Sequence, residues 1–298
     1  MQAVTHDGTF HADDVFAFAV LRAAVPGVAL ARTRDAVAAE AADLVFDVGS
    51  IYDPRTRRYD HHMRDRPLRD DGATPYSSLG LIWRDYGRDA ARAFLDGETT
   101  PEVVEAVWRE LDASLVIEID RTDNGVGASG AGQLSSAIES FNPVWDEPGD
   151  HDAAFMRAAE FARGILARRC RQIAASERAK GIVAVASRAG DDPRIVVLDR
   201  KLPWEAAVYD GGLTEALYVI YPDEQHARWY CRAVSTGPDS FEQRLPFPER
   251  WAGLRDAEFS QAAEIEDGVF CHPSRFICAA TSRESAIELA RRAIASAE

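Results

Sequence analysis

Lysine is almost absent from this chain of 298 residues, in which only Lys180 and Lys201 occur and arginine is the default cation. Acidic side chains number 49 and give a formal net charge of −15. Such a chain lacks the broad positive field that non-specific coating of nucleic acid requires. The acidity excludes that class of binding and is still compatible with a locally basic cleft.

Cysteine is also scarce, with four residues and no pair at C-x-x-C spacing. This usage is typical of reduced, mostly buried thiols in a cytosolic protein. No apolar run is long enough to span a bilayer, and the N-terminus lacks the charged and apolar regions of a signal peptide. We therefore expect a soluble cytoplasmic protein without a membrane partner.

Histidine occurs seven times, and four of the seven lie in the first 62 residues, in two dense clusters. One cluster is the run from Thr5 to Asp14, and the other is the triplet at 60–62. An apolar run between them ends at Asp47. Each cluster alone could be a polar turn or a helix cap. Together with Asp47, this gathering of carboxylate and imidazole predicts a site for hard or borderline divalent cations.

The N-terminal part of the chain alternates between apolar strands and amphipathic helices. The strands are expected at 2–6, 27–33 and 43–48, and the helices at 13–24 and 35–42. Such alternation predicts an α/β domain with a mostly parallel sheet covered on both faces. Ligands of these sheets bind beyond the carboxyl ends of the strands, which is where His6, Asp47 and Asp60 fall. The sequence therefore predicts one shared site.

The rest of the chain predicts a second, smaller domain. Helices are expected at 76–86 and 100–119, followed by a long helix at 151–179. Beyond it, strands at 181–187, 194–198, 216–221 and 228–233 precede a final helix at 282–297. We expect a catalytic domain over 1–150, a connecting helix over 151–180 and a mixed-sheet α/β domain over 181–298.

A site for two cations needs a carboxylate that bridges them, typically about 3.5–4 Å apart. Asp47 is the natural candidate because a buried strand ends there, although taken alone it could be a strand-terminal cap. His6, His11 and Asp13 converge if the intervening residues form a loop, which Gly8 permits.

Three other acids are less clearly assigned. Asp14 is favoured as a helix cap rather than as a metal ligand. Asp120 and Asp123 form a further carboxylate region beside the strong turn signal Asn124-Gly125. Either acid could bind a cation or be an ordinary turn residue.

The order of these motifs resembles the DHH phosphoesterase superfamily: H-x4-H-x-D-D, then D-V-G, then D-H-H, then I-D-x-x-D-N-G. Longer segments are similar to one branch, the MYG1 family, and together they cover nearly the whole chain. These segments are 5–14, 32–35, 59–62, 76–83 and 241–256.

The resemblance implies a two-domain hydrolase with two divalent ions, an N-terminal catalytic domain and a C-terminal domain that grips the substrate. By this mapping one ion takes His6, His11 and Asp47. The other takes Asp13, Asp47, His61 and a carboxylate from Asp120 or Asp123, while His62 faces the substrate phosphate and Asp60 completes the catalytic set. An imidazole at His11 replaces a carboxylate of the superfamily pattern, which favours manganese over magnesium and leaves zinc open.

MYG1 relatives are described as 3′-to-5′ RNA exonucleases. The resemblance therefore implies a metal-dependent phosphodiesterase that acts on RNA or short oligonucleotides through a water activated by two metals. Two alternatives stay open: a small-molecule phosphohydrolase, such as a pyrophosphatase or nucleotide phosphatase, and a non-catalytic metal- or nucleotide-binding module. A homo-oligomer is also open.

Substrate contacts are expected in two places. Relatives carry a loop H-x-S-G-F-I-G-G, and here His272 and Arg275 occupy it, with Arg275, Cys278 and Ala279 in place of glycines. We expect His272 and Arg275 to bind substrate. Six arginines around the Asp-His-His triplet are compatible with phosphate binding, or are simply the chain's default cation: Arg55, Arg57, Arg58, Arg64, Arg66 and Arg69.

Overall fold

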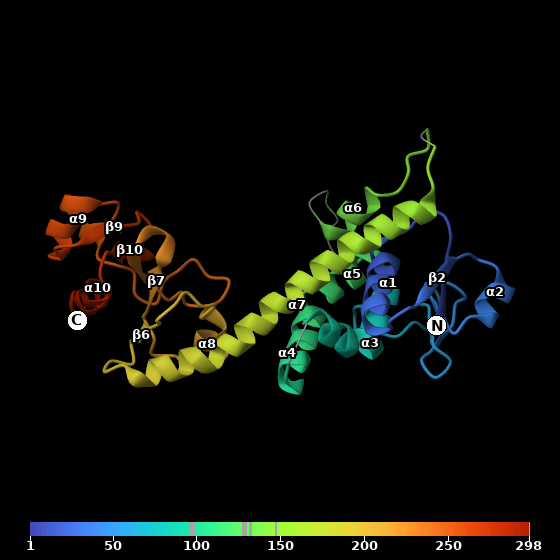
Figure 1. The fold of residues 1–298 in the computed structure, drawn as a ribbon, viewed down its shortest axis with the longest axis horizontal. Coiled ribbons are helices and arrows are strands. Elements are labelled where there is room, and N and C mark those ends of the chain that lie inside the picture. The colour runs from blue at the N-terminus through green and yellow to red at the C-terminus, as the bar shows by residue number, and fades with distance from the viewer. Residues whose placement is uncertain (96–98, 127–129, 131–132, 147, 298) are drawn as a thin grey trace. The chain divides into compact units, whose positions relative to one another are not determined.

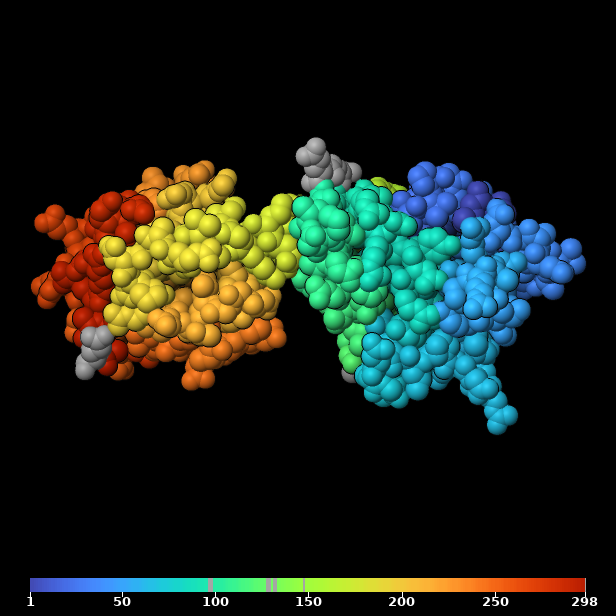
Figure 2. Space-filling model, turned by 90° about the horizontal axis from the view of Figure 1, so that it is seen from below, coloured from blue at the N-terminus to red at the C-terminus, as the bar shows by residue number. Residues whose placement is uncertain are grey.

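The computed structural model describes residues 1–95, 99–126, 130, 133–146 and 148–297. Its contacts divide the chain into two units, Met1–Ala174 and Ala175–Glu298. Figure 1 labels the elements of each unit, and Figure 2 shows their surfaces in the same blue-to-red colouring. Each unit is described by itself.

The first unit is built on a five-stranded sheet in the order β2-β1-β3-β5-β4. Pairing is parallel between β1 and β2, β1 and β3, and β3 and β5, and only the edge strand β4 runs antiparallel to its neighbour. The mostly parallel sheet predicted from the sequence is therefore confirmed. The strands are β1 (Gln2–Thr5), β2 (Ala29–Arg32), β3 (Leu44–Phe46), β4 (Tyr52–Asp53) and β5 (Arg58–Tyr59).

This topology brings three distant stretches of sequence to one edge of the sheet. Strands β1, β3 and β5 are adjacent and parallel, so their carboxyl ends meet at the same edge. The next residues along the chain are His6, Asp47 and Asp60 respectively. The expectation that these residues follow strand ends is confirmed.

Helices cover this sheet. Helix α1 is buried from Ala12 to Leu21, which accounts for its apolar residues on every side, and it packs against α3. The predicted helix at 100–119 is present as α4, a π-helical turn (Asp112–Val116) and α5. The helices are α1 (Ala12–Ala24), α2 (Ala36–Ala41), α3 (Ser78–Phe94), α4 (Pro101–Leu111), α5 (Ile117–Asp123) and α6 (Leu134–Glu139).

The long helix α7 (His151–Ala189) continues ten residues beyond the expected end at 179. The predicted strand at 181–187 is therefore wrong. Val183 is fully buried whereas Ile182 and Val185 are 43% and 63% exposed, so only one side of this β-branched stretch packs. Tertiary packing here overrides a local preference for extended backbone.

The second unit holds a mixed sheet in the order β6-β7-β8-β10-β9, parallel only between β6 and β7. This confirms the predicted mixed-sheet α/β fold. Its strands are β6 (Ile195–Val197), β7 (Tyr218–Asp223), β8 (Arg228–Ala233), β9 (Gly268–Cys271) and β10 (Ile277–Ala280). Its helices are α8 (Glu205–Tyr209), α9 (Asp256–Ala263) and α10 (Arg283–Ala295), with 3₁₀ turns at Glu224–His226 and Glu249–Trp251. Among the helices so described, none is long and apolar enough to cross a membrane.

Candidate metal centre

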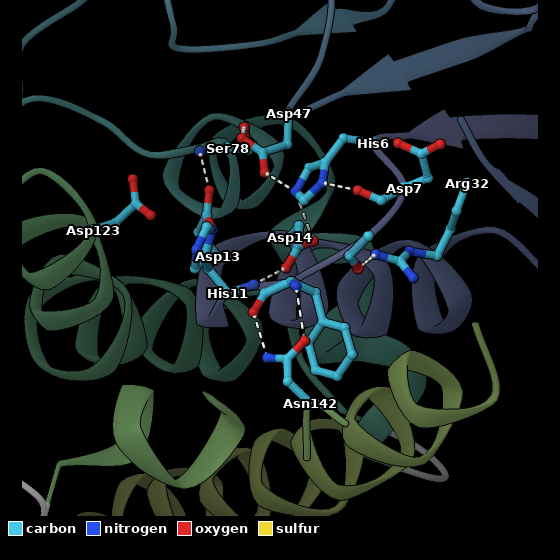
Figure 3. Close-up of polar contacts among 12 residues, drawn as sticks. His6, Asp7, His11, Asp13, Asp14, Arg32, Asp47, Ser78, Asp123 and Asn142 are labelled. Atoms are coloured by element: carbon cyan, nitrogen blue, oxygen red, sulfur yellow. Dashed lines mark hydrogen bonds and ion pairs between the residues drawn. The ribbon is translucent and has the colours of Figure 1, made fainter. Parts of the chain in front are cut away.

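Asp47 is buried and lies beside His6, near Asp13 and Asp14 (Figure 3). Its Oδ2 is 3.2 Å from Nε2 of His6, and its Oδ1 is 3.3 Å from Nε2 of His61. The hydroxyl of Ser78, at the start of α3, donates to Oδ1 at 3.0 Å. The backbone of Asp47 is left-handed, with φ of 56°, a conformation that aspartate adopts more readily than most residues. One carboxylate thus faces two imidazoles.

His6 and Asp14 form one side of the group. Nε2 of His6 is 3.1 Å from Oδ2 of Asp14, while Oδ1 of Asp14 accepts a hydrogen bond from the backbone N–H of His11 at 3.0 Å. Asp14 therefore caps α1, as expected, and also contacts a predicted ligand, which the sequence analysis missed. A carboxylate has two oxygens, and here they serve different neighbours.

His61 and the acids Asp13 and Asp123 form the other side. Nε2 of His61 is 3.3 Å from Oδ2 of Asp123 and 3.7 Å from Oδ2 of Asp13. The backbone N–H of Ser78 donates to the same Asp13 oxygen at 3.3 Å. This amide belongs to the first turn of α3, so the positive end of the helix faces the acid.

Among the residues that the structure describes, three sets of side chains each place one ligand atom per residue within 4.8 Å of one another. Asp47 belongs to two of the sets and links them. His11 is grouped with Asp13 and Asp123, whereas the resemblance had grouped it with His6 and Asp47. The sets are Asp47-His61-His62, His6-Asp14-Asp47 and His11-Asp13-Asp123.

The loop between β1 and α1 has the conformation that was expected to bring His6, His11 and Asp13 close together. Gly8 has φ of 80°, the left-handed conformation that the predicted loop needs. Asn142 accepts from the Phe10 N–H at 3.1 Å and donates to its carbonyl at 2.9 Å, and Arg32 donates to the Gly8 carbonyl at 2.7 Å (Figure 3). The loop is thereby anchored at Gly8 and at Phe10.

Asp60 and His62 form a pair beside Asp47. Nδ1 of His62 is 2.7 Å from Oδ1 of Asp60, whose other oxygen accepts from the Ser50 N–H at 2.5 Å. The hydrogen bond to Asp60 raises the pKa of His62 above its usual range. The His62 side chain is 60% exposed, whereas those of Asp60 and His61 are buried. His62 is thus the member of this pair that solvent reaches.

Asp120 lies outside the three sets. Its Oδ2 accepts from Nε of Arg69 at 2.6 Å, and its Oδ1 accepts from the N–H and hydroxyl of Ser77 at 3.0 and 2.5 Å. Both Asp120 oxygens are therefore engaged in a buried network at the start of α3. Of the two acids left open by the sequence, Asp123 is the one beside His61.

The burial of so many acids shifts their protonation. Burial raises the pKa of Asp13, and the nearby carboxylates of Asp47, Asp123 and Asp14 raise it further. Burial opposes ionisation of Asp47 as well, but hydrogen bonds from His6 and His61 outweigh it and hold the pKa of Asp47 below its usual range. Like charges at such spacing are unfavourable without a compensating cation.

The donor atoms also fit a cation. Oδ1 of Asp13 and Nδ1 of His61 are buried, and neither finds a hydrogen-bond partner within the described part of the chain. Buried polar atoms are normally paired. Carboxylate oxygens with imidazole nitrogens are a donor set suited to manganese, magnesium or zinc. The residues present therefore fit divalent cations.

Two cavities open beside these side chains, and His11 and His62 line both. One, of about 510 Å³, extends past His6 and Asp47 to Arg34. The other, of about 350 Å³, extends past His61 and Asp123 to Arg66. Of the six arginines noted in the sequence, Arg66 lines a cavity, whereas Arg69 is buried against Asp112 and Asp120.

The two residues expected to bind substrate lie in the second unit. His272 accepts from the Ser274 N–H at 3.1 Å, and the Arg275 guanidinium donates to the Phe247 carbonyl at 3.2 Å. Arg275 has φ of 57°, so the backbone keeps a conformation that favours glycine although an arginine is present. This backbone conformation agrees with the family loop pattern, in which a glycine stands where this chain has Arg275.

A model of the family MYG1_exonuc, described as an uncharacterised protein family (UPF0160), matches residues 2–294. The chain belongs to the MYG1 family. A human relative named MYG1 exonuclease is 33% identical, covering 98% of this chain and 85% of its own. MYG1 proteins of Caenorhabditis elegans (32% identical, 97% and 94% covered) and Schizosaccharomyces pombe (31%, 99% and 97%) also match over nearly their full length.

One solved structure, RecJ from Thermus thermophilus in complex with Mn²⁺, aligns with 99% of this MYG1 chain and 52% of its own. The identity is 16% and the TM-score is 0.26, so this likeness supports no conclusion about the site. Assignment to the MYG1 family rests on the sequence matches.

Proposed function

We propose that this MYG1 protein is a metal-dependent phosphodiesterase whose cations are held by the group around Asp47. The observation that carries the proposal is the Asp47 carboxylate, which faces His6 and His61 at 3.2 and 3.3 Å with Asp13, Asp14 and Asp123 around them. A buried carboxylate shared between two ligand sets is the arrangement that a two-cation hydrolytic site needs.

In this proposal one ion would be held by His6, Asp14 and Asp47, and the other by Asp47, His61, Asp13 and Asp123, with His11 beside the last two. Bound divalent cations would supply Lewis acidity for the hydrolysis of a phosphodiester. The exposed edge of His62 donates to a phosphate oxygen, because Asp60 occupies its Nδ1 and favours the protonated ring. Ser78 donates hydrogen bonds to Asp47 and Asp13 from the start of α3.

The substrate in this proposal is RNA or a short oligonucleotide, shortened from its 3′ end, and the cations are two manganese ions. The name exonuclease among the relatives supports the substrate class. Imidazoles among the ligands favour manganese over magnesium. The four buried free cysteines suit a reducing compartment, and we place the activity in the cytoplasm.

A small-molecule phosphohydrolase is the second candidate, favoured by the net charge of −15, which repels a long polyanion. Purified protein with manganese should be offered RNA and DNA labelled at either end, dinucleotides and pyrophosphate. Stepwise release from the 3′ end of RNA supports the proposal. Cleavage of pyrophosphate alone supports the second candidate, and no turnover on any substrate leaves a binding module.

His272 and Arg275 are proposed as substrate contacts in the second unit. An Arg275→Ala variant should weaken apparent substrate affinity more than manganese affinity, and more at low than at moderate salt, because a phosphate contact fades as ionic strength rises. Unchanged kinetics would assign Arg275 to its contact with Phe247 alone.

A further inference from the structure

Each of the two cavities beside the metal centre contains a single arginine among its described lining residues: Arg34 in one and Arg66 in the other. The walls otherwise carry histidines, acids and neutral groups. Four carboxylates lie at the centre itself, so an incoming phosphate outside the reach of the cations meets a negative field. A second or third phosphate therefore needs its own positive partner.

The two arginines flank opposite ends of the centre. Nη2 of Arg34 is 3.2 Å from Nδ1 of His6, while Nη1 of Arg66 donates to Oδ1 of Asn124, the residue after Asp123. His6 and Asp123 belong to different ligand sets, with Asp47 between them. The arginines thus bracket the centre rather than share one side of it.

In both arginines, hydrogen bonds fix the Nη1 atom of the guanidinium while the side chain stays exposed to solvent. Nη1 of Arg34 donates to the carbonyl and carboxylate of Asp7 at 2.5 and 2.6 Å, yet its side chain is 60% exposed. Arg66 is exposed and uses Nη1 for Asn124 at 2.7 Å. A guanidinium fixed in this way presents its remaining N–H groups in a planar fork that matches phosphate oxygens.

We propose that Arg34 and Arg66 bind the phosphates on the two sides of the scissile one, so that the substrate is a short linear strand that passes His11 and His62, which line both cavities. This inference rests on the proposed phosphodiesterase activity and deepens it by naming the substrate feature that is recognised. A strand cleaved at an internal bond, or one whose last nucleotide carries a 3′-phosphate, has a phosphate on each side of the cleaved bond and uses both cavities. A strand that ends in a 3′-hydroxyl and loses its last nucleotide uses only the cavity on the 5′ side. A bare dinucleotide uses only the centre.

The test compares a dinucleotide without terminal phosphates, the same dinucleotide with a 5′-phosphate, and the same with a 3′-phosphate, each with the full chain and manganese. Each terminal phosphate should raise kcat/KM by about 10- to 100-fold, the range for a charge-assisted contact. Arg34→Ala should abolish the gain from one end and Arg66→Ala the gain from the other. The variant that loses the gain from the 5′-phosphate identifies the arginine on the 5′ side of the scissile phosphate, which gives the direction of the bound strand.

Arg55→Ala is the matched control, because Arg55 is exposed and lines neither cavity; it should keep both gains. Equal rates on all three dinucleotides with the wild type, or both gains retained in both arginine variants, would overturn the inference. Loss of manganese affinity in Arg34→Ala, measured by calorimetry, would also overturn it by making Arg34 a support for His6. Failure of the wild type to cleave any dinucleotide counts instead against the proposed activity.

Discussion

At the scale of single residues, the centre concentrates negative charge in a place that burial makes costly. Asp13, Asp14 and Asp47 are each at most 4% exposed, and Asp123 lies beside them. Burial and mutual repulsion raise the pKa values of Asp13, Asp14 and Asp123, with burial the largest cause for each. Such an arrangement is unfavourable in the metal-free fold, and cations bound there, as proposed, would relieve it.

A neutral isostere at Asp13 should therefore raise the stability of the metal-free protein and weaken its binding of manganese. Asp13→Asn keeps an oxygen for the Ser78 N–H but removes one buried charge. In the presence of a chelator its melting temperature should rise by a few degrees, since about 1 kcal/mol corresponds to roughly 2–4 °C in a unit of this size. The further rise that manganese gives the wild type should shrink. A lower melting temperature without metal would refute the repulsion argument.

His61 and His62 are neighbours with different surroundings, and their variants should differ accordingly. His61 is buried among Asp13, Asp47 and Asp123, whereas His62 is 60% exposed and paired with Asp60. His61→Ala should lose manganese affinity. His62→Ala should keep manganese content and lower kcat by about 10²–10³, the range for one lost oxyanion donor. Equal manganese loss, measured by metal analysis after gel filtration, would contradict this division.

At the scale of elements, the start of α3 links the candidate metal centre to the buried hydrogen-bond network around Asp120. Ser78 contacts Asp47 and Asp13, while the preceding Ser77 contacts Asp120. Gly80 lies two residues further on, where a Cβ would come within 2.7 Å of Oδ1 of Asp120 and Cδ1 of Tyr76. The absence of a side chain at Gly80 allows Asp120 to reach the helix start.

Gly80→Ala should accordingly disturb both stability and activity. Overpacking of this kind costs roughly 1–3 kcal/mol, and moving the helix start displaces Ser78 from two ligands. Gly164→Ala in α7 is the control, because a Cβ there meets nothing within 4 Å. That change should be neutral or stabilise by about 0.5–1 kcal/mol. Melting temperatures and manganese affinities of the two variants test this prediction. Equal values for Gly80→Ala and Gly164→Ala would refute the role of Gly80.

Features that depend on local sequence could be predicted, whereas features that depend on tertiary contacts could not. The positions of His6, Asp47 and Asp60 at strand ends follow from alternation of apolar and polar residues, which is local information. Choosing between Asp120 and Asp123 needs the packing of α5 against α3, because the two acids lie about one turn apart in the same helix. The second oxygen of Asp14 escaped detection for the same reason: a capping signal is local, but a contact with His6 is not.

For other residues the sequence contains a recognisable pattern, but their structural role depends on tertiary packing. The Tyr76-to-Trp83 motif marked the family but gave no role to Ser77 or Ser78, which hold three of the acids discussed here. The strand expected at 181–187 was wrong because β-branched residues tolerate a helix when one face is buried. Arginines near the Asp-His-His triplet looked alike in sequence, yet burial separates Arg69 from Arg66.

At the scale of the whole molecule, the proposed ligands all belong to one unit. Met1–Ala174 contains each of the three ligand sets, and its own core runs from Ala3 to Ala174. The second unit, Ala175–Glu298, has separate buried clusters around its mixed sheet. Cation binding at the proposed ligands should therefore stabilise the first unit directly, by mass action on its folded state.

Calorimetric melting of the full chain should show this selectivity. Manganese at about 100 times its dissociation constant stabilises a binding unit by about 2.7 kcal/mol. The transition of the first unit should move upward by several degrees, while the transition of the second unit keeps its temperature. The Asp47→Asn variant assigns the transitions, because it keeps a residue tolerant of the left-handed backbone but removes the shared charge. In that variant manganese should move neither transition. A manganese-dependent shift confined to the second unit would place the cations outside the Asp47 group and refute the proposed centre.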